Sequence, residues 1–398
     1  MKEIVVTGAV RTPIGKFGGM LANITAAELG AIVIKEALVR SRLDCSQVDE
    51  VLMGCVLQGG QGQNVARQAA VKAGLPISVP ALTVNNVCGS GLKCVNIAYG
   101  LIASGEAEVI VAGGMENMSM APYLLPGARF GYRMNDGSLK DSLIKDALWD
   151  AFGDYHMGIT AENIAQQYNI TRKMQDMFAA GSQQKYQKAR KAGIFAEEIV
   201  PVPIKAKNGT EWMSEDENPR DNVTAGSLSK LKPAFKAEGT VTAGNASGIN
   251  DGAAAVIIMT EEKAGKLGLP ILARVRGGQS VGVDPSIMGI GPVASTRKLL
   301  NKLGLSVADM DLIEANEAFA AQSLAVEQLL GFDKEKVNVN GGSIALGHPV
   351  GASGCRILVT LLHELKRRNG KLGLATLCVG GGMGVSIVVE NYRNESAD

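Results

Sequence analysis

Short runs of apolar and β-branched residues recur along the chain, and longer segments with apolar residues at helical spacing lie between them. The short runs predict buried strands and fall at 4–6, 109–112, 256–259, 374–379 and 387–389. The segment after Thr25 opens with a capping-box signature, Thr25-Ala26-Ala27-Glu28, and predicts a helix. Apolar residues at helical spacing also follow Cys88. This alternation predicts an α/β protein built in layers.

The two ends of the chain resemble each other at a nearly constant offset. The matching positions are Asp49 with Asp311, Ser90-Gly91 with Ser353-Gly354, and the triplet Gly-Gly-Met at 113–115 with that at 381–383. Their offsets are 262, 263 and 268. A repeat of this kind predicts two similar α/β halves. We assign the first half to 1–118 plus 250–269, the second half to 270–398, and an inserted loop domain to 119–249.

Composition and charge exclude several classes of protein. The 398 residues include 40 Lys+Arg and 39 Asp+Glu, and the net charge of +1 argues against a general nucleic-acid-binding surface. The chain lacks an uncharged apolar run of about 18 residues, and its start lacks the features of a signal peptide. We therefore expect no membrane segment and a cytoplasmic location. Six cysteines and three histidines predict neither a disulfide framework nor a metal site.

Cys88 is the first candidate for chemistry. The run Val87-Cys88-Gly89-Ser90-Gly91 follows a predicted strand and opens a predicted helix. The positive end of the helix dipole would lower the pKa of this thiol below about 8.5 and favour the reactive thiolate. On this motif alone, a structural cysteine at a helix start is an equally good interpretation.

Three further residues are candidates, and the repeat places one of them, His348, opposite Cys88. The matching run in the second half contains His348, which becomes a base for Cys88 if the two helix starts face each other. Cys378 ends a predicted strand and precedes three glycines. Asn316 follows another strand, and it could donate towards a developing oxyanion or simply cap a helix.

Four motifs, in their order and spacing, closely resemble the thiolase family: VCGSG, NEAFA, NGGSIALGHPVGASG and LCVGGGMG. The resemblance runs from MKEIVVTGAVRTPIG to GMGVSIVVE and so covers essentially the whole chain. It implies a duplicated, five-layered α/β/α/β/α core, with a five-stranded sheet in each half, plus an inserted loop domain.

The resemblance also implies a role for each candidate. Cys88 would accept the acyl group, His348 would activate it, and Cys378 would act as acid and base on the α-carbon of the second substrate. Asn316 would form one oxyanion hole together with His348. The backbone N–H groups of Cys88 and Gly380 would form a second one.

Residues of the inserted segment resemble the ligand-binding side of the family. His156 and Met157 resemble the wall of a small acyl pocket, which indicates a short substrate. Arg220 would meet the nucleotide of CoA and Ser247 its pantetheine arm. Phe235 lies in a segment that resembles CoA-contacting ones, and the NEAFA motif adds Ala318 and Phe319 to the substrate-binding residues. The neighbouring lysines could equally form a solvated basic face.

The expected activity is reversible condensation of two acetyl-CoA molecules to acetoacetyl-CoA and CoA through an acetyl-Cys88 intermediate. The CoA thioesters are substrates, and we expect no separate cofactor. Three alternatives stay open: a 3-ketoacyl-CoA thiolase of broader specificity, a non-catalytic acyl-CoA-binding relative and a decarboxylating synthase. The segment 120–146 resembles the loop through which such enzymes form tetramers, so we expect a homotetramer, with a plain surface loop as the alternative.

Overall fold

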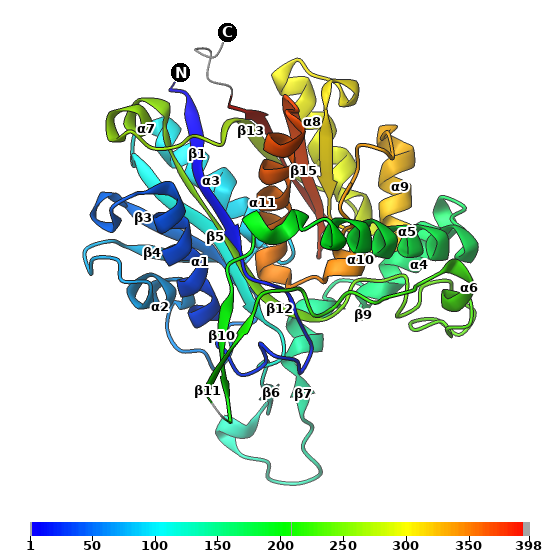
Figure 1. Ribbon diagram of the computed structural model, residues 1–398. Helices are drawn as coiled ribbons and strands as arrows, with labels where there is room; N and C mark the ends of the chain where they lie inside the picture. Colours follow the sequence, from blue (N-terminus) through cyan, green and yellow to red (C-terminus); the bar gives the residue numbers. More distant parts are fainter. Residues whose placement is uncertain (1, 208, 393–398) are drawn as a thin grey trace.

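The computed structural model describes residues 2–207 and 209–392. Its centre is a ten-stranded mixed sheet in the order β14-β15-β16-β13-β1-β12-β5-β3-β4, with β2 paired to β12 (Figure 1). The strands are β1 (Ile4–Arg11), β2 (Gly15–Lys16), β3 (Glu50–Gly54), β4 (Ala81–Val84), β5 (Val109–Asn117), β12 (Asn250–Thr260), β13 (Ala273–Gly282), β14 (Leu312–Ala315), β15 (Leu372–Val379) and β16 (Met383–Asn391). The five strands predicted from apolar runs are confirmed as parts of β1, β5, β12, β15 and β16.

The strand order is mirrored about the junction between β1 and β13. On one side it runs β1-β12-β5-β3-β4, and on the other side β13-β16-β15-β14. Two residue pairs, Val5 with Arg274 and Val6 with Ala273, join the two sides into one sheet. The fifth position of the second side is reduced to a single bridge between Ile313 and Val337. Pairing β1 with β13 leaves neither strand as an exposed sheet edge.

The helices form three layers, one in the middle between the two sides of the sheet and one outside each side (Figure 1). In the middle, α3 (Ser90–Ser104) packs on α11 (Val350–Arg368), and both contact strands of the two sides. Two outer layers complete the core, with α1 (Ala26–Ser41) and α2 (Val65–Lys72) on one side and α8 (Gly291–Leu303) and α9 (Ala320–Leu330) on the other. The capping box predicted at Thr25 and Glu28 is confirmed at the start of α1.

The window Val87–Ser104, which contains α3, is long and apolar enough to cross a membrane by composition, with a mean hydropathy of 1.2. In the fold, α3 lies between strands of both sides of the sheet. The apolar side chains of α3 therefore pack in the core of the protein.

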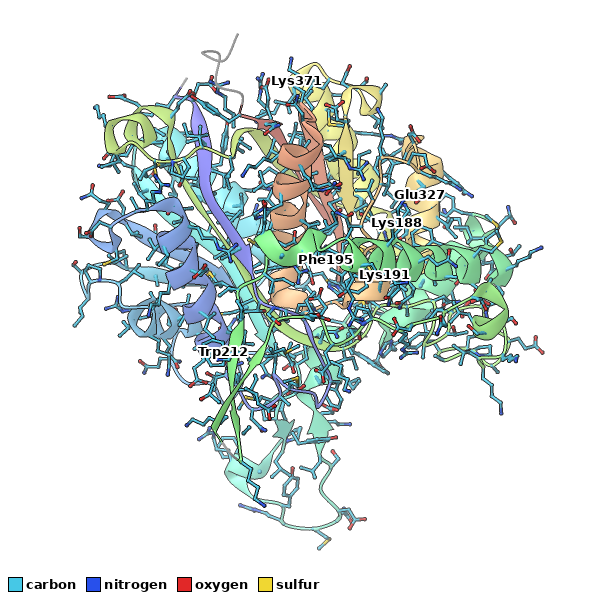
Figure 2. All side chains as sticks on the ribbon, in the orientation of Figure 1. Lys188, Lys191, Phe195, Trp212, Glu327 and Lys371 are labelled. Carbon is cyan, nitrogen blue, oxygen red and sulfur yellow. The ribbon has the colours of Figure 1, made fainter. Side chains whose placement is uncertain are left out.

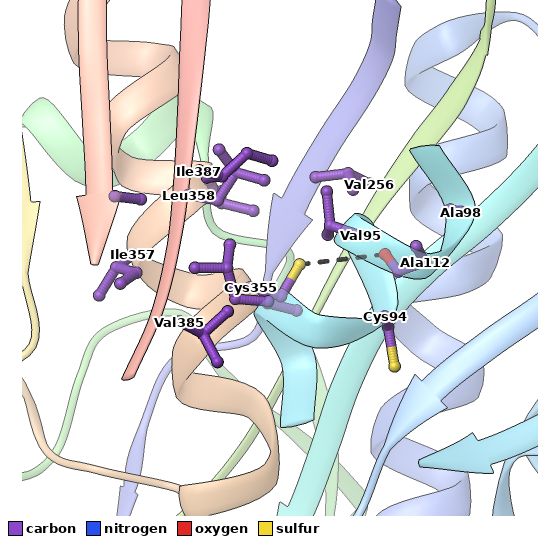
Figure 3. Packing of buried hydrophobic residues seen from close by; sticks show 14 of the residues in the cluster. Cys94, Val95, Ala98, Ala112, Val256, Cys355, Ile357, Leu358, Val385 and Ile387 are labelled. Atoms are coloured by element: carbon purple, nitrogen blue, oxygen red, sulfur yellow. Dashed lines mark hydrogen bonds between the residues drawn. The ribbon is translucent and has the colours of Figure 1, made fainter. Parts of the chain in front are cut away.

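The middle layer is held together by close contact between α3 and α11. A Cβ atom on Gly91 would lie 2.8 Å from the backbone N of Cys355, and one on Gly354 would lie 2.5 Å from that of Leu92. Figure 3 shows Cys94 and Cys355 in this layer among valine, isoleucine and leucine side chains. Both are free, buried thiols that pack as small core residues.

The internal repeat is confirmed in part. Asp49 Oδ2 accepts hydrogen bonds from the N–H groups of Glu108 and Val109, and Asp311 Oδ2 accepts them from the corresponding Lys371 and Leu372. The match between the two Gly-Gly-Met triplets is wrong. The first lies inside β5, where the chains pack too closely for a Cβ atom, whereas the second lies in the β15–β16 turn, with glycine φ angles of 81° and 83°. The domain boundaries proposed from the repeat stay a prediction, and residues 1 and 393–398 lie outside the described residues.

Residues 119–249 form a less regular region beside the core. Its elements are β6 (Tyr123–Leu124), β7 (Lys140–Asp141), β8 (Trp149–Asp150), β9 (Tyr155–His156), α4 (Met157–Gln167), α5 (Arg172–Lys191), β10 (Val202–Ala206), β11 (Gly209–Met213) and α6 (Ala225–Leu228). Lys188 and Lys191 lie on the exposed face of α5, and the buried Phe195 follows the helix (Figure 2). After this region come β12, which contains the strand predicted at 256–259, and α7 (Glu261–Leu267). The short helix α10 (Ser343–Leu346) precedes α11.

Candidate active site

One cavity of about 480 Å³ brings together most of the predicted site residues. Its lining includes Cys88, His156, Met157, Arg220, Phe235, Ser247, Ala318, Phe319, His348 and Gly380. Cys378 and Asn316 lie behind this wall, with exposed fractions of 0% and 1%. The cavity thus joins residues from both sides of the sheet and from the inserted region.

Cys88 sits on a tight turn between β4 and α3. The preceding Val87 has a φ of 43°, a left-handed conformation that is unusual for a β-branched residue. Gly89 and Ser90 donate backbone hydrogen bonds to the carbonyls of Asn86 and Val87, which hold the turn closed. Strain of this kind is found where the surrounding structure fixes a reactive side chain in place. The turn presents Cys88 to the cavity two residues before α3 begins.

The expectation of a lowered thiol pKa at Cys88 is wrong for the protein without substrate. Burial raises the pKa of Cys88 to about 11, although the N–H groups of Gly380 and of Cys88 itself favour the thiolate. The helix-dipole argument considered only the local chain and left out desolvation, which disfavours the charged form. Cys88 is therefore a neutral thiol at neutral pH.

His348 lies in the turn between α10 and α11 and is held from two directions. Its backbone N–H donates to Asn250 Oδ1 at 2.9 Å, and its ring Nδ1 lies 2.6 Å from Ser353 Oγ. Ser353 Oγ donates its hydrogen to the carbonyl of Pro349, so it accepts from Nδ1–H of the ring. This arrangement leaves Nε2 of His348 without a proton. Burial and the charge of Arg356 lower the pKa of His348 to about 3, so the ring is a neutral base.

Asn316 contacts His348 directly. Its Nδ2 lies 3.4 Å from Nε2 of His348, and its Oδ1 accepts a hydrogen bond of 2.5 Å from Ser343 Oγ. The interpretation of Asn316 as a helix cap is excluded, because Phe319 is the N-cap residue of α9. The amide hydrogens of Asn316 point towards the base, where an oxyanion could be bound.

Cys378 and Gly380 come from the end of β15 and the loop after it. Burial and the neighbouring Cys88 raise the pKa of Cys378, so this second thiol is also protonated. Cys378 belongs to an apolar cluster with Met157 and Phe319. The N–H of Gly380 reaches Cys88, and a Cβ on Gly380 would lie 3.1 Å from Val87 Cγ1. This strand end therefore carries both a protonated thiol and a backbone hydrogen-bond donor.

Aromatic side chains form one wall of the cavity. His156 stacks on Phe235 with ring centroids 4.6 Å apart, and Phe235 meets the edge of Phe319 at 6.2 Å. Nδ1 of His156 accepts from the N–H of Gly158, which fixes the ring at the start of α4, and burial lowers the pKa of His156.

The remaining predicted residues line the same cavity. The N–H of Ser247 donates to the carbonyl of Ala318, so the segment of Ser247 runs along the NEAFA motif. Arg220 is exposed and lines the cavity as well. An exposed cation can meet a phosphate without being desolvated first.

Sequence reasoning missed several residues that shape the site. Ser343 and Ser353 stand inside the long glycine-rich motif, but nothing in their spacing showed that one bonds Asn316 and the other His348. Glu116 accepts from the N–H of Gly351 at 2.8 Å and ties α11 to the loop after β3. The strain at Val87 could have been suspected from the reactive cysteine that follows it.

Comparison with known proteins finds relatives along the whole chain. Family profiles described as "Thiolase, N-terminal domain" and "Thiolase, C-terminal domain" match residues 4–262 and 269–391. A protein of Pseudomonas aeruginosa named acetyl-CoA acetyltransferase is 60% identical over 390 residues, covering 98% of this chain and 99% of its own. A protein of the same name from Cupriavidus necator is 59% identical over 391 residues, covering 98% of this chain and 100% of its own.

Solved structures show the same fold. The acetyl-CoA acetyltransferase of Bacillus anthracis has a TM-score of 0.97 and 48% identity, covering 98% of this chain and 99% of its own. Human mitochondrial 3-ketoacyl-CoA thiolase in complex with CoA has a TM-score of 0.95 and 45% identity, covering 98% of each chain. The two profiles together span nearly the whole chain, and the relatives match it from end to end. The chain therefore belongs to the thiolase family and has the thiolase fold.

Proposed function

We propose that the protein is an acetyl-CoA acetyltransferase that interconverts two acetyl-CoA molecules with acetoacetyl-CoA and CoA. The observation that carries this proposal is the convergence of Cys88, His348 and Gly380 on one cavity, with Cys378 and Asn316 behind its wall. The relatives from P. aeruginosa and C. necator bear this name and support the same reaction here. The CoA thioesters are the substrates.

In the thiolysis direction, the sulfur of Cys88 attacks the 3-keto carbon of acetoacetyl-CoA while its proton passes to Nε2 of His348. The C2–C3 bond then breaks, which leaves the acetyl group on Cys88. The electron pair of the broken C2–C3 bond goes to C2 of the departing acetyl-CoA, and C2 takes a proton from the thiol of Cys378. The protonated state of Cys378 at rest supports its role as the acid.

In the second half-reaction, the thiol of CoA gives its proton to the thiolate of Cys378, and its sulfur attacks the acetyl carbonyl. The bond from the acetyl carbon to Cys88 breaks, and the thiolate of Cys88 takes the proton back from His348. Every group has then returned to its starting state. Condensation follows the same steps in reverse.

Negative charge collects on a carbonyl oxygen in each step, and two sets of donors would stabilise it. Asn316 and His348 would bind the oxygen of the enolate, and the N–H groups of Cys88 and Gly380 would bind that of the tetrahedral intermediate. The approach of the Gly380 N–H to Cys88 supports the second assignment. Donors fixed towards such an oxygen usually make the largest catalytic contribution.

A short acyl group fits the walls of the cavity. The stacked rings of His156 and Phe235, the edge of Phe319 and the side chain of Met157 close the space beside the reactive thiols. The alternative is a 3-ketoacyl-CoA thiolase of broader specificity, the name borne by the human structure. Comparing kcat/KM for thiolysis of acetoacetyl-CoA and of longer 3-ketoacyl-CoAs decides between them, because the proposal requires a preference for acetoacetyl-CoA.

Mass spectrometry after incubation with acetyl-CoA tests the mechanism. We expect one acetyl group on the peptide that contains Cys88, and none on the same peptide of a Cys88→Ala variant. Cys45→Ala is the matched control, because Cys45 is a free thiol outside the cavity. Full turnover by Cys88→Ala, or acetylation at another residue, contradicts the mechanism. Binding of acyl-CoA without acetylation or turnover would indicate the non-catalytic alternative.

We also propose that the protein assembles as a homotetramer through residues 120–146. The segment forms the β6–β7 hairpin, which extends away from the core (Figure 1). It carries Phe130 and Met134 with exposed fractions of 87% and 85%, and such apolar side chains are usually covered by a partner. Light scattering should give the mass of four chains, and a Phe130→Ser/Met134→Ser variant should give a smaller assembly. A monomeric wild-type protein would contradict the proposal.

A further inference from the structure

Behind the active site, a file of four polar side chains runs from α11 to the base. Nη2 of Arg356 lies 3.1 Å from Ser343 Oγ, Ser343 Oγ lies 2.5 Å from Asn316 Oδ1, and Asn316 Nδ2 lies 3.4 Å from Nε2 of His348. None of the four is more than 5% exposed. The file is therefore shielded from solvent along its length.

The hydrogen bonds of this file can run in only one direction. A guanidinium group has donors and no acceptor, so Ser343 Oγ must accept from Arg356. The single hydrogen of Ser343 is then free for Asn316, whose Oδ1 becomes the acceptor. This leaves the NH₂ group of Asn316 facing His348. Reversing the amide would take the acceptor away from the hydroxyl hydrogen of Ser343 and place the amide oxygen against the unprotonated Nε2 of His348, where two acceptors would face each other.

Arg356 is a fully buried side chain whose hydrogen bonds are incomplete. It forms an ion pair of 3.5 Å with Glu314, and the two side chains are 2% and 3% exposed. Within the part of the chain that the structure describes, its Nε and Nη1 have no hydrogen-bond partner. Glu198, Glu317 and Arg11 add further charges around it. A buried guanidinium with so few hydrogen bonds is costly, and such a cost is expected mainly where function requires the residue.

We propose that Arg356 and Ser343 are positioning residues, which fix the amide of Asn316 with its NH₂ group towards His348 and the substrate oxygen. This inference rests on the proposed function, since it gives Asn316 its orientation for the oxyanion hole. Neither residue touches the substrate. Both act through the orientation of one side-chain amide.

The test is a double-mutant cycle on thiolysis of acetoacetyl-CoA by CoA. Ser343→Ala should lower kcat about tenfold and leave KM within about twofold, because binding is unaffected while the donor is misplaced. Asn316→Ala should lower kcat about a hundredfold. The double variant should be no slower than Asn316→Ala alone, because the hydroxyl has no other route to the reaction. Independent effects would instead multiply to about a thousandfold.

A second variant tests the same positioning role in case Ser343→Ala is too unstable to assay. Arg356→Met combined with Glu314→Gln removes both members of this buried pair together and should also lower kcat about tenfold at unchanged KM. Ser295→Ala is the matched control, since its buried hydroxyl bonds Ser386 in another layer and should leave kcat unchanged. Thermal midpoints of all variants verify that each is folded at the assay temperature.

The outcomes separate this inference from the proposed function. Multiplicative loss in the double variant, or near-wild-type kcat in Ser343→Ala and in the Arg356 variant, overturns the positioning role and leaves the catalytic role of Asn316 intact. Near-wild-type kcat in Asn316→Ala overturns that catalytic role, and the positioning role with it. A raised KM with unchanged kcat in Ser343→Ala also contradicts the inference.

Discussion

Ser353→Ala removes the hydroxyl that accepts the Nδ1–H of His348, and this should change the tautomer of the ring. The two atoms are 2.6 Å apart, and His348 is 5% exposed. Without the hydroxyl, the ring must either bury an unpaired N–H or move its proton to Nε2. The second choice blocks the nitrogen that would accept the proton of Cys88.

The size of the effect follows from the cost of an unpaired buried donor. That cost is about 1–3 kcal/mol. Since 1.4 kcal/mol corresponds to a factor of ten, the ratio of the productive tautomer to the other one should fall by roughly 5- to 150-fold. We expect kcat for thiolysis of acetoacetyl-CoA to fall by up to this factor. KM should change little, because the hydroxyl does not line the cavity.

Two measurements check the reasoning. Steady-state kinetics gives kcat and KM, and ¹⁵N NMR of the labelled ring reports which nitrogen of His348 carries the proton. Ser295→Ala serves again as the control for loss of a buried hydroxyl. If Ser353→Ala keeps wild-type kcat and the proton stays on Nδ1, the hydroxyl of Ser353 does not set the tautomer of His348.

Three further predictions follow from the same structure. Alkylation of Cys88 by iodoacetamide should still accelerate above pH 9 with a midpoint near 11, and a plateau below pH 8.5 would show that the helix dipole outweighs burial. Met157→Ala should open the acyl pocket and raise kcat/KM for longer 3-ketoacyl-CoAs relative to acetoacetyl-CoA; an unchanged ratio would show that Met157 does not limit chain length. Gly354→Ala places a Cβ 2.5 Å from the N of Leu92 and should lower the free energy of unfolding in urea by about 1–3 kcal/mol. Gly100→Ala, with open space around its Cβ on α3, is its control and should be neutral or stabilising.

Local features of the fold could be predicted from the sequence, and its long-range pairing could not. The capping box at Thr25 and the strands around 109–112 and 374–379 are set by neighbouring residues, so pattern alone identifies them. The junction of β1 with β13 depends on two residue pairs that are far apart in the chain. The false Gly-Gly-Met match has a similar cause, because identical triplets can serve a close packing contact in one place and a turn in another.

The candidate site divides in the same way. Residues inside long motifs, such as Cys88 and His348, could be named from the sequence, and the structure brings them to one cavity. Their protonation could not be predicted, since burial decides it and burial is a property of the whole fold. The hydrogen bonds that Ser343, Ser353 and Arg356 make in the site could not be predicted for the same reason. A hydroxyl has no preferred partner until the backbone is placed around it.

The protonation states also bear on how the proposed reaction is driven. With the pKa of Cys88 at about 11 and that of His348 at about 3, the pair is neutral at rest, and no thiolate waits for the substrate. In the proposed mechanism, the sulfur would lose its proton as charge passes to a substrate oxygen that is held by donors. A donor that is strong only at that moment stabilises the transition state more than the ground state. The orientation of Asn316 and Gly380 is then more decisive than the acidity of the thiol, and burial of both thiols protects them from side reactions between turnovers.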